Sequence, residues 1–444
     1  MKKPIVSLLG ILALLAPFAA AQDLVLKGGT ILTITQGTIE NGTVVIQKGK
    51  ITAVGRDVAI PPGARVVDIT GKFIMPGIVD SHAHIAFSGD DTNEMTDPVT
   101  SHIWMKDALV PDHETIRTTL AGGVTTVKTM HGSANVIGGV NVVIKLKYAR
   151  PLSELIVADI RPQLKMALGE NPKRVYGQKG RTPSTRMGNA YVARKAFQDA
   201  RDYKAKWDKY EQDKAAGKKD LAPPERDPKL ETLKMVLEKK MSIDCHIYRA
   251  DEIVWFLGFC QEFGLDLKQI SHCVDGYKVA DLMAAQNVSF GGWTDWWGFK
   301  EESYDGCPFG FKIMLDAGVN IAINTDSADE GRYMYLNAAK VLKYNDIPEL
   351  ECLKMITINA AKTLEMESRI GSIETGKDGD IAVFDKHPLD STTKVLMTII
   401  EGEVFFDYAK ETKADSAAQT PGMGSSVATP PDGAAARAKG VYHE

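Results

Sequence analysis

The sequence has few cysteines, no marked excess of charge of either sign and no long apolar run beyond its first 21 residues. Five cysteines without C-x-x-C spacing argue against a disulfide framework. Lys and Arg number 53 against 57 Asp and Glu, so no broad basic field exists to attract nucleic acid or an anionic membrane. We therefore expect no nucleic-acid partner. Because no later run approaches the roughly 18 residues of a membrane span, we also expect no stable membrane anchor.

The first 21 residues have the pattern of a secretory signal. A positive start at Met1-Lys2-Lys3 precedes an apolar stretch from Ile5 to Phe18, and Ala19-Ala20-Ala21 supplies small residues before Gln22. We expect cleavage near Ala21/Gln22 and an exported protein, periplasmic or secreted.

Two kinds of hydrophobic pattern divide the rest of the chain. Short alternating runs over 22–75 and again over 366–408 predict strands, with a tight hairpin at Lys48-Gly49. Between them, residues 76–365 alternate short apolar runs with amphipathic stretches, which is typical of parallel strands covered by helices. The sequence therefore predicts an α/β fold. We expect a (β/α)8 barrel of the TIM type, with both chain ends forming one discontinuous small β-sandwich domain.

Two further segments differ in composition from this pattern. Residues 191–240 are rich in charged residues at helical spacing and are broken near Pro223-Pro224, which predicts a helical hairpin inserted in the barrel. Residues 409–444 contain mainly Ala, Pro, Gly and Ser, so we expect a disordered tail there.

Histidine is scarce, with nine residues, and four of them, at strand-like runs, form a pattern that suggests metal binding. His82 and His84 are two residues apart and so share one strand face, while His246, His272 and Asp326 each close a separate run. Because the carboxyl ends of barrel strands meet at one mouth, these side chains are expected to lie together. Four imidazoles and a carboxylate suit zinc or another first-row divalent ion.

Several motifs together resemble those of the amidohydrolase superfamily. They are Pro76-Gly77-Ile78-Val79-Asp80-Ser81-His82-Ala83-His84, the single histidines after two later strands, Thr325-Asp326-Ser327 and the run from Gly371 to Ile381. The similarity runs from about residue 24 to residue 407. Gly122-Gly123-Val124 and the Gly132 to Gly139 stretch resemble an exported branch near the imidazolonepropionase-like group.

The resemblance implies a two-ion site, most simply with two zinc ions. His82, His84 and Asp326 would hold one ion, and His246 and His272 the second. Two ions need a bridging anion, and the resemblance favours Glu170, with a carbamylated Lys165 as the alternative. A site with a single ion, which needs no bridge, is the third possibility. Asp326 would also move the proton from the metal-activated water to the leaving amine.

Weaker signals concern substrate binding at the mouth. His131 follows a strand-like run, Tyr248 stands two residues after His246, Arg186 could clamp a carboxylate, and Lys300 ends an aromatic stretch. A loop hydrogen bond for His131 and an ordinary salt bridge for Arg186 are the competing interpretations.

We expect an exported metal-dependent amidohydrolase that cleaves an amide or cyclic amide C–N bond of a small molecule or dipeptide. The alternative is a hydrolytic deaminase or an imidazolonepropionase-like ring hydrolase. A third interpretation is a binding protein without activity on the same barrel. The sequence does not decide the oligomeric state, and a homo-oligomer is one of the possibilities.

Overall fold

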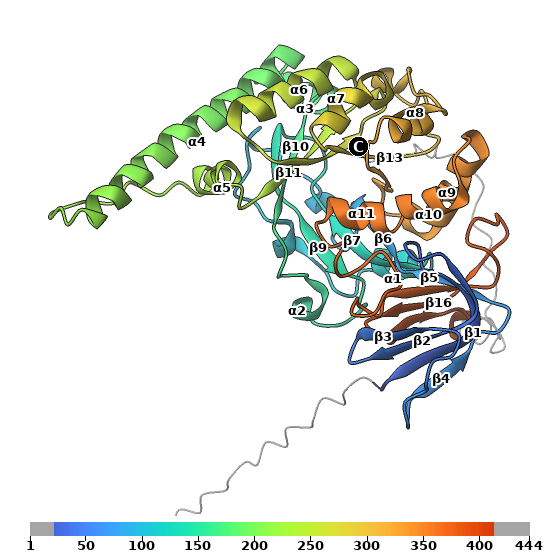
Figure 1. Ribbon diagram of the computed structural model, residues 1–444. Helices are drawn as coiled ribbons and strands as arrows, with labels where there is room; N and C mark the ends of the chain where they lie inside the picture. The colour runs from blue at the N-terminus through green and yellow to red at the C-terminus, as the bar shows by residue number, and fades with distance from the viewer. Residues whose placement is uncertain (1–21, 413–444) are drawn as a thin grey trace, which may run out of the picture.

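The computed structural model describes residues 22–412. The expected signal lies outside this range, as does the expected tail apart from residues 409–412. Figure 1 shows a sheet built from the blue and red ends of the chain beside a barrel surrounded by helices. Among the residues described, no helix combines the length and hydropathy that a membrane span requires.

Strands from both chain ends form one eight-stranded sheet. Its order is β17-β16-β15-β5-β1-β2-β3, with β4 also paired to β1. The turn at Lys48-Gly49 has positive φ at both residues, 50° and 79°, as a two-residue hairpin requires. The division of this sheet into two sandwich layers stays a prediction. Its strands are β1 (Leu24–Leu32), β2 (Thr38–Gln47), β3 (Lys50–Gly55), β4 (Arg65–Asp68), β5 (Phe73–Pro76), β15 (Ile381–Phe384), β16 (Val395–Ile400) and β17 (Glu403–Asp407).

The barrel wall consists mainly of short, fully buried strands. Parallel pairing joins the first two strands, and it also joins the five consecutive strands from β10 to β14. The predicted α/β barrel of the TIM type is confirmed. Its strands are β6 (Ile78–Ala83), β7 (Val124–Thr129), β8 (Ile137–Val140), β9 (Val142–Lys145), β10 (Gln163–Ala167), β11 (Ser242–Ile247), β12 (Leu267–His272), β13 (Ser289–Gly292) and β14 (Ile321–Ile323).

The third position of the barrel wall, between β7 and β10, differs from the expected alternation of one parallel strand with one helix. β8 and β9 are separated by Asn141 alone; β9 pairs antiparallel with β7, and β8 pairs antiparallel with β10. An antiparallel neighbour needs only a short connection, whereas a parallel one needs a crossover of a dozen residues or more. The loop 130–136 therefore stays at the mouth and brings its own side chains to the site.

Helices cover the outside of the barrel, and the charged insertion forms α4 and α5, which pack together (Figure 1). α4 begins at Arg186, five residues before the expected start of the insertion. The helices are α1 (Glu114–Leu120), α2 (Leu152–Leu155), α3 (Glu170–Gly177), α4 (Arg186–Ala215), α5 (Pro228–Leu237), α6 (Ala250–Phe263), α7 (Ala280–Ala285), α8 (Gly310–Asp316), α9 (Met334–Tyr344), α10 (Glu349–Met355) and α11 (Ile358–Thr363).

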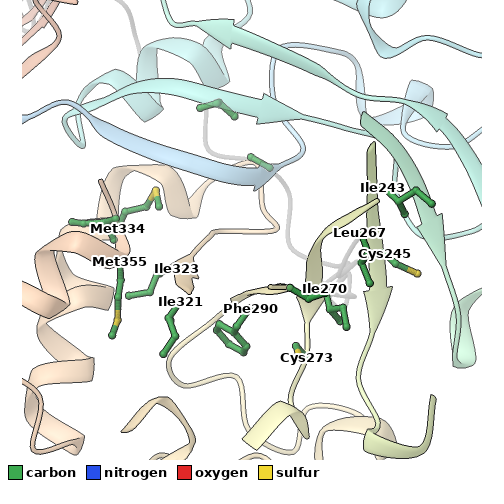
Figure 2. Packing of buried hydrophobic residues seen from close by; sticks show 14 of the residues in the cluster. Ile243, Cys245, Leu267, Ile270, Cys273, Phe290, Ile321, Ile323, Met334 and Met355 are labelled. Carbon is green, nitrogen blue, oxygen red and sulfur yellow. The ribbon is translucent and has the colours of Figure 1, made fainter. Parts of the chain in front are cut away.

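The main hydrophobic core lies between the barrel strands and these helices. Figure 2 shows Ile321 and Ile323 of β14 near Met334 and Met355 at helix ends, with Cys245 of β11 in the same cluster. Since successive strand side chains alternate, the residues on either side of Cys245 point the opposite way, into the barrel. The outer face thus supplies packing while the inner face carries polar side chains.

Candidate metal centre

Three side chains converge at the strand ends in a geometry suited to a metal ion. One ligand atom from each of His82, His272 and Asp326 lies within 4.8 Å of the others. Oδ1 of Asp326 is 3.0 Å from Nε2 of both His82 and His84. His246 adjoins them, with its ring centroid 4.2 Å from that of His272. The structure therefore brings together all four histidines and the aspartate that the sequence singled out.

Asp80 connects the two strands that carry the first ligands. Its carboxylate accepts hydrogen bonds from the backbone N–H of His82 at 3.0 Å and from the Thr325 hydroxyl at 2.6 Å. The backbone N–H of Asp326 donates to the carbonyl of His82 at 2.9 Å. These bonds join the ends of β6 and β14 and place His82 beside Asp326.

The hydrogen-bond partners of His84 and His246 orient these rings towards an ion. Nδ1 of His84 lies 2.9 Å from the carbonyl oxygen of Met130, and a carbonyl can only accept, so this nitrogen carries the proton. Nδ1 of His246 lies 2.8 Å from the Ser133 hydroxyl, which leaves Nε2 buried and without a partner among the described residues. Metal-binding imidazoles are held in this way by their second nitrogen.

The donor set fits a divalent cation better than it fits an ordinary hydrogen-bond network. With the proton of His84 on Nδ1, its Nε2 presents a lone pair to the Asp326 carboxylate at 3.0 Å. Two acceptors at this distance repel each other unless a cation lies between them. Imidazole nitrogens and a carboxylate oxygen are ligands of zinc and related ions.

The backbone is strained at two of these ligands. His272 has φ of 71° and Asp326 has φ of 50°, in the left-handed region that non-glycine residues seldom occupy. On β12 the preceding inward residues are Gln269 and Ser271, so strict alternation would turn His272 outward. The turn in the backbone directs its ring into the cluster. Such strain concentrates at functional sites.

Of the two residues considered for the bridge, Lys165 is the one that the structure places in contact with a ligand histidine. Nζ of Lys165 is fully buried and 3.3 Å from Nε2 of His82. Glu170 instead begins α3, is partly exposed, and acts electrostatically on Glu302.

The depth of Lys165 in the barrel and the length of its side chain explain its position beside His82. Ala167 is level with His246 in the parallel ladder, and Lys165 lies one pleat deeper, level with Asp244. A lysine side chain spans about one pleat repeat, roughly 6.6 Å, so its amine rises to the imidazole level past the small Ala167. Glu170 follows Gly169, whose φ of 76° leads the chain away into the helix.

The charges of the cluster favour metal binding near neutral pH. Burial, and then the nearby Lys165, lower the pKa of His82 to about 4, and burial lowers the pKa of both His246 and His272. Burial alone would raise the pKa of Asp326, but His272 and His82 bring it well below its usual range. Burial also lowers the pKa of Lys165. Neutral imidazoles and an ionised carboxylate are the forms that bind metal.

Aromatic side chains form one wall beside the ligands. The ring of Tyr248 stacks on His272 with centroids 4.9 Å apart, and Trp293 stacks on His272 at 4.6 Å. Nζ of Lys300 lies 4.0 Å from the centre of the Tyr248 ring. Two of the predicted substrate-binding residues, Tyr248 and Lys300, thus lie next to the cluster.

Arg186 takes part in two salt bridges, the second of the two interpretations that the sequence left open. Its guanidinium donates to Glu252 at 3.2 Å and to Glu302 at 2.8 Å, and Glu302 is almost fully buried. Both carboxylates would lose this ion pair if Arg186 turned to a substrate. The salt-bridge interpretation therefore holds for this residue.

His131 lies at the mouth, in the loop after β7. Its Nε2 is buried and has no hydrogen-bond partner among the described residues. Burial, and then Lys165, lower its pKa to about 4. This nitrogen faces the backbone of β8, since a Cβ at Gly139 would lie 2.5 Å from it. A role of His131 in substrate binding stays a prediction.

The sequence patterns did not point to the residues that hydrogen-bond to the candidate ligands or to the partners of those ligands. Ser133, Ser271, Asp244 and Lys128 are buried and connected to the cluster by hydrogen bonds. One signal was available, since Asp244 precedes His246 by two residues and must share its strand face.

Comparison with known proteins gives a consistent result. The family model described as the amidohydrolase family matches residues 73–405. The amidohydrolase tasK of Hapsidospora irregularis is 31% identical over 82% of this chain, although the chain spans only 40% of that protein's length. An imidazolonepropionase of Fusobacterium nucleatum is 26% identical over 78% of this chain and 85% of its own length.

Solved structures show the same fold. An amidohydrolase from Thermotoga maritima MSB8 superposes with a TM-score of 0.79 at 37% identity, covering 86% of this chain and 100% of the other. An adenosine deaminase from Xanthomonas campestris with bound zinc has a TM-score of 0.50 at 18% identity, covering 89% of this chain and 97% of the other. At that identity the second similarity concerns the fold alone.

Proposed function

We propose, from the premise that this chain belongs to the amidohydrolase family, that it is an exported metal-dependent enzyme which cleaves an amide or cyclic amide bond. The family assignment makes it a hydrolase of carbon–nitrogen bonds. The family generally uses a divalent metal, and the binuclear site, the mechanism and the substrate are our proposals.

The observation that carries this proposal is the joint position of Lys165 and the histidines. The Lys165 amine faces Nε2 of His82 at 3.3 Å, in the interior of the barrel and beneath the ligand cluster. Burial favours the neutral amine, and a neutral amine is the form that reacts with carbon dioxide to give a carbamate. In that form Lys165 would supply the bridging anion, with His82, His84 and Asp326 on one ion and His246 and His272 on the other.

Bound divalent ions would supply Lewis-acid activation of a water molecule and of the substrate carbonyl. Asp326 is placed at the centre of the ligand cluster, where its carboxylate can accept the proton of the attacking water. It then returns this proton to the leaving nitrogen, a transfer that needs a carboxylate in contact with the reacting atoms.

The aromatic wall bears on the class of substrate. Tyr248, Trp293 and Phe299 lie within ring-contact distance of one another, and Lys300 places an ammonium beside them. An apolar or cyclic group next to the scissile bond would pack on these rings, as ligands do in largely apolar pockets with a few polar groups. N-acyl amino acids, dipeptides and cyclic amides have this character.

The second candidate is a deaminase or ring hydrolase, which the names of two relatives suggest. An imidazolonepropionase and a 5-methylthioadenosine/S-adenosylhomocysteine deaminase each align over more than three quarters of this chain. A deaminase of this kind would need an acidic residue close after His246. The buried acidic residue of α6, Glu252, accepts hydrogen bonds from Gly169 and Arg186. Because its carboxylate is already bonded there, we rank this candidate second.

The metal content of two variants distinguishes Lys165 from Glu170 as the bridging residue. We expect about two divalent ions per wild-type chain by elemental analysis of protein purified without chelator or nickel. Lys165→Ala should hold one ion or fewer, because the bridging anion is lost, whereas Glu170→Gln should keep both. Circular dichroism verifies that each variant is folded. Two ions in Lys165→Ala together with a loss in Glu170→Gln would reverse our assignment.

Export is part of the proposal and rests on the sequence of residues 1–21. Amino-terminal sequencing of protein from a periplasmic or culture fraction should begin at Gln22. A protein recovered in the cytoplasm with Met1 intact would contradict it.

A further inference from the structure

A buried ion pair, Lys128–Asp244, lies inside the barrel but outside the group of candidate ligands. Nζ of Lys128 is 2.7 Å from Oδ2 of Asp244, and both side chains are completely buried. Their strands, β7 and β11, are not neighbours in either sheet, so the contact crosses the barrel interior. Burying two charges is costly, and the proposed chemistry does not use this pair directly.

The ion pair is connected to a ligand through one hydroxyl. Oγ of Ser271 donates to Oδ1 of Asp244 at 2.7 Å, and the same oxygen lies 2.7 Å from Nδ1 of His82. A serine hydroxyl has one proton, and the lysine-paired carboxylate can only accept it. Ser271 therefore has only lone pairs for His82, and Nδ1 of His82 must be the donor.

This direction of hydrogen bonding determines which nitrogen of His82 faces the ion. With the proton on Nδ1, Nε2 has its lone pair directed towards Asp326 and Lys165, at 3.0 and 3.3 Å. In contrast, Nδ1 of His84 faces a neutral carbonyl and Nδ1 of His246 faces a hydroxyl. His82 alone of these three is connected to a buried charge.

We propose that Asp244, held by Lys128, is a positioning residue that acts through Ser271 to keep His82 in the metal-binding tautomer. Such outer contacts also raise the basicity of a ligand imidazole, and their loss typically weakens metal binding roughly 10–100-fold. Asp244 and Ser271 would not touch the substrate. Their effect would appear in the affinity for metal rather than in substrate binding.

The test compares isosteric substitutions at Ser271, and it rests on the proposed metal site. Ser271→Thr keeps the hydroxyl, whereas Ser271→Val replaces it by a methyl group of the same shape, so both variants share any packing disturbance. Zinc and cobalt dissociation constants are measured by competition with a chromophoric chelator. A matched control is Ser242→Ala beside Ser271→Ala, because Ser242 is also fully buried but its hydroxyl has no hydrogen-bond partner among the described residues.

We expect Ser271→Val and Ser271→Ala to bind zinc roughly 10–100-fold more weakly than wild type, while Ser271→Thr and Ser242→Ala stay within about threefold. Folding of each variant is verified by circular dichroism. Equal zinc affinity in the Thr and Val variants would overturn the inference. A wild-type protein that binds neither metal would instead overturn the proposed function, so the two failures are distinguishable.

Discussion

At the scale of single residues, Asp326 is the residue whose substitution we expect to lower kcat most. It contacts two histidines through one oxygen, and its backbone is held in a left-handed conformation that directs the carboxylate into the cluster. An amide in its place cannot accept the proton of the attacking water.

We therefore predict that Asp326→Asn lowers kcat by about 100- to 10,000-fold. The measurement uses the best substrate found among N-acyl amino acids, dipeptides and cyclic amides, with metal content determined on the same preparation. A variant that keeps both its metal and its turnover would show that Asp326 does not carry the proton.

Some of these residues could be identified from the sequence, and others could not, for a physical reason. His82, His84, His246, His272 and Asp326 follow apolar runs, and strand ends of a barrel necessarily meet at one mouth. The bridging residue depends on the depth and reach of a side chain, which a linear pattern does not contain. For Arg186 the sequence left a carboxylate clamp and an ordinary salt bridge open, because its partners, Glu252 and Glu302, come from distant segments.

At the scale of elements, the antiparallel third position of the barrel is the feature that sequence patterns did not reveal. Its β8 contains Gly138-Gly139, and glycine weakens the strand signal. At Gly139 a glycine is needed because His131 and Ile103 approach this backbone closely. A Cβ at Gly139 would lie 2.5 Å from Nε2 of His131 and 2.5 Å from the carbonyl of Ile103.

The two glycines provide a matched pair of substitutions. Gly139 has φ of 150°, so Gly139→Ala combines backbone strain with a steric clash, and we expect it to lower the free energy of unfolding by about 2–4 kcal/mol. At Gly138 the atoms nearest to an added Cβ lie at 3.5 Å or more, so Gly138→Ala should change the free energy of unfolding by less than about 1 kcal/mol. Urea unfolding of both variants measures the difference. Equal destabilisation by the two would contradict the close approach at Gly139.

At the scale of the whole molecule, buried charges join the barrel to the terminal sheet. Nζ of Lys145, at the end of β9, lies 3.2 Å from Asp380 and 2.8 Å from Glu401, and it also contacts Asp378. These acidic residues precede β15 or follow β16. The third position of the barrel therefore connects the catalytic half of the chain to the domain formed by its ends.

The pH dependence of unfolding also belongs to this scale, because it depends on every buried titratable group. The pKa of His131 is about 4 in the folded protein, against about 6.5 in an unfolded chain. Between these values the unfolded chain binds a proton that the native state does not, so the stability falls as the pH falls. Asp80, with its pKa raised to about 7 mainly by burial, contributes with the opposite sign.

A comparison with His131→Gln isolates the histidine's contribution. In metal-free protein, we expect wild type to lose about 2 kcal/mol more of its free energy of unfolding between pH 7 and pH 5 than the variant does. Urea titrations at the two pH values measure this difference. Identical losses would mean that His131 is protonated in the native state at pH 5.

The strand order of the terminal sheet also affects the sequence of events during synthesis. β5 lies between β1 and β15, and Ile74 pairs with Val383 across that junction. While a ribosome makes the barrel, the β15 side of β5 stays open, and open strand edges invite pairing with other chains. Only a chain completed through β15 can cover that edge, so the terminal sheet distinguishes finished chains from interrupted ones.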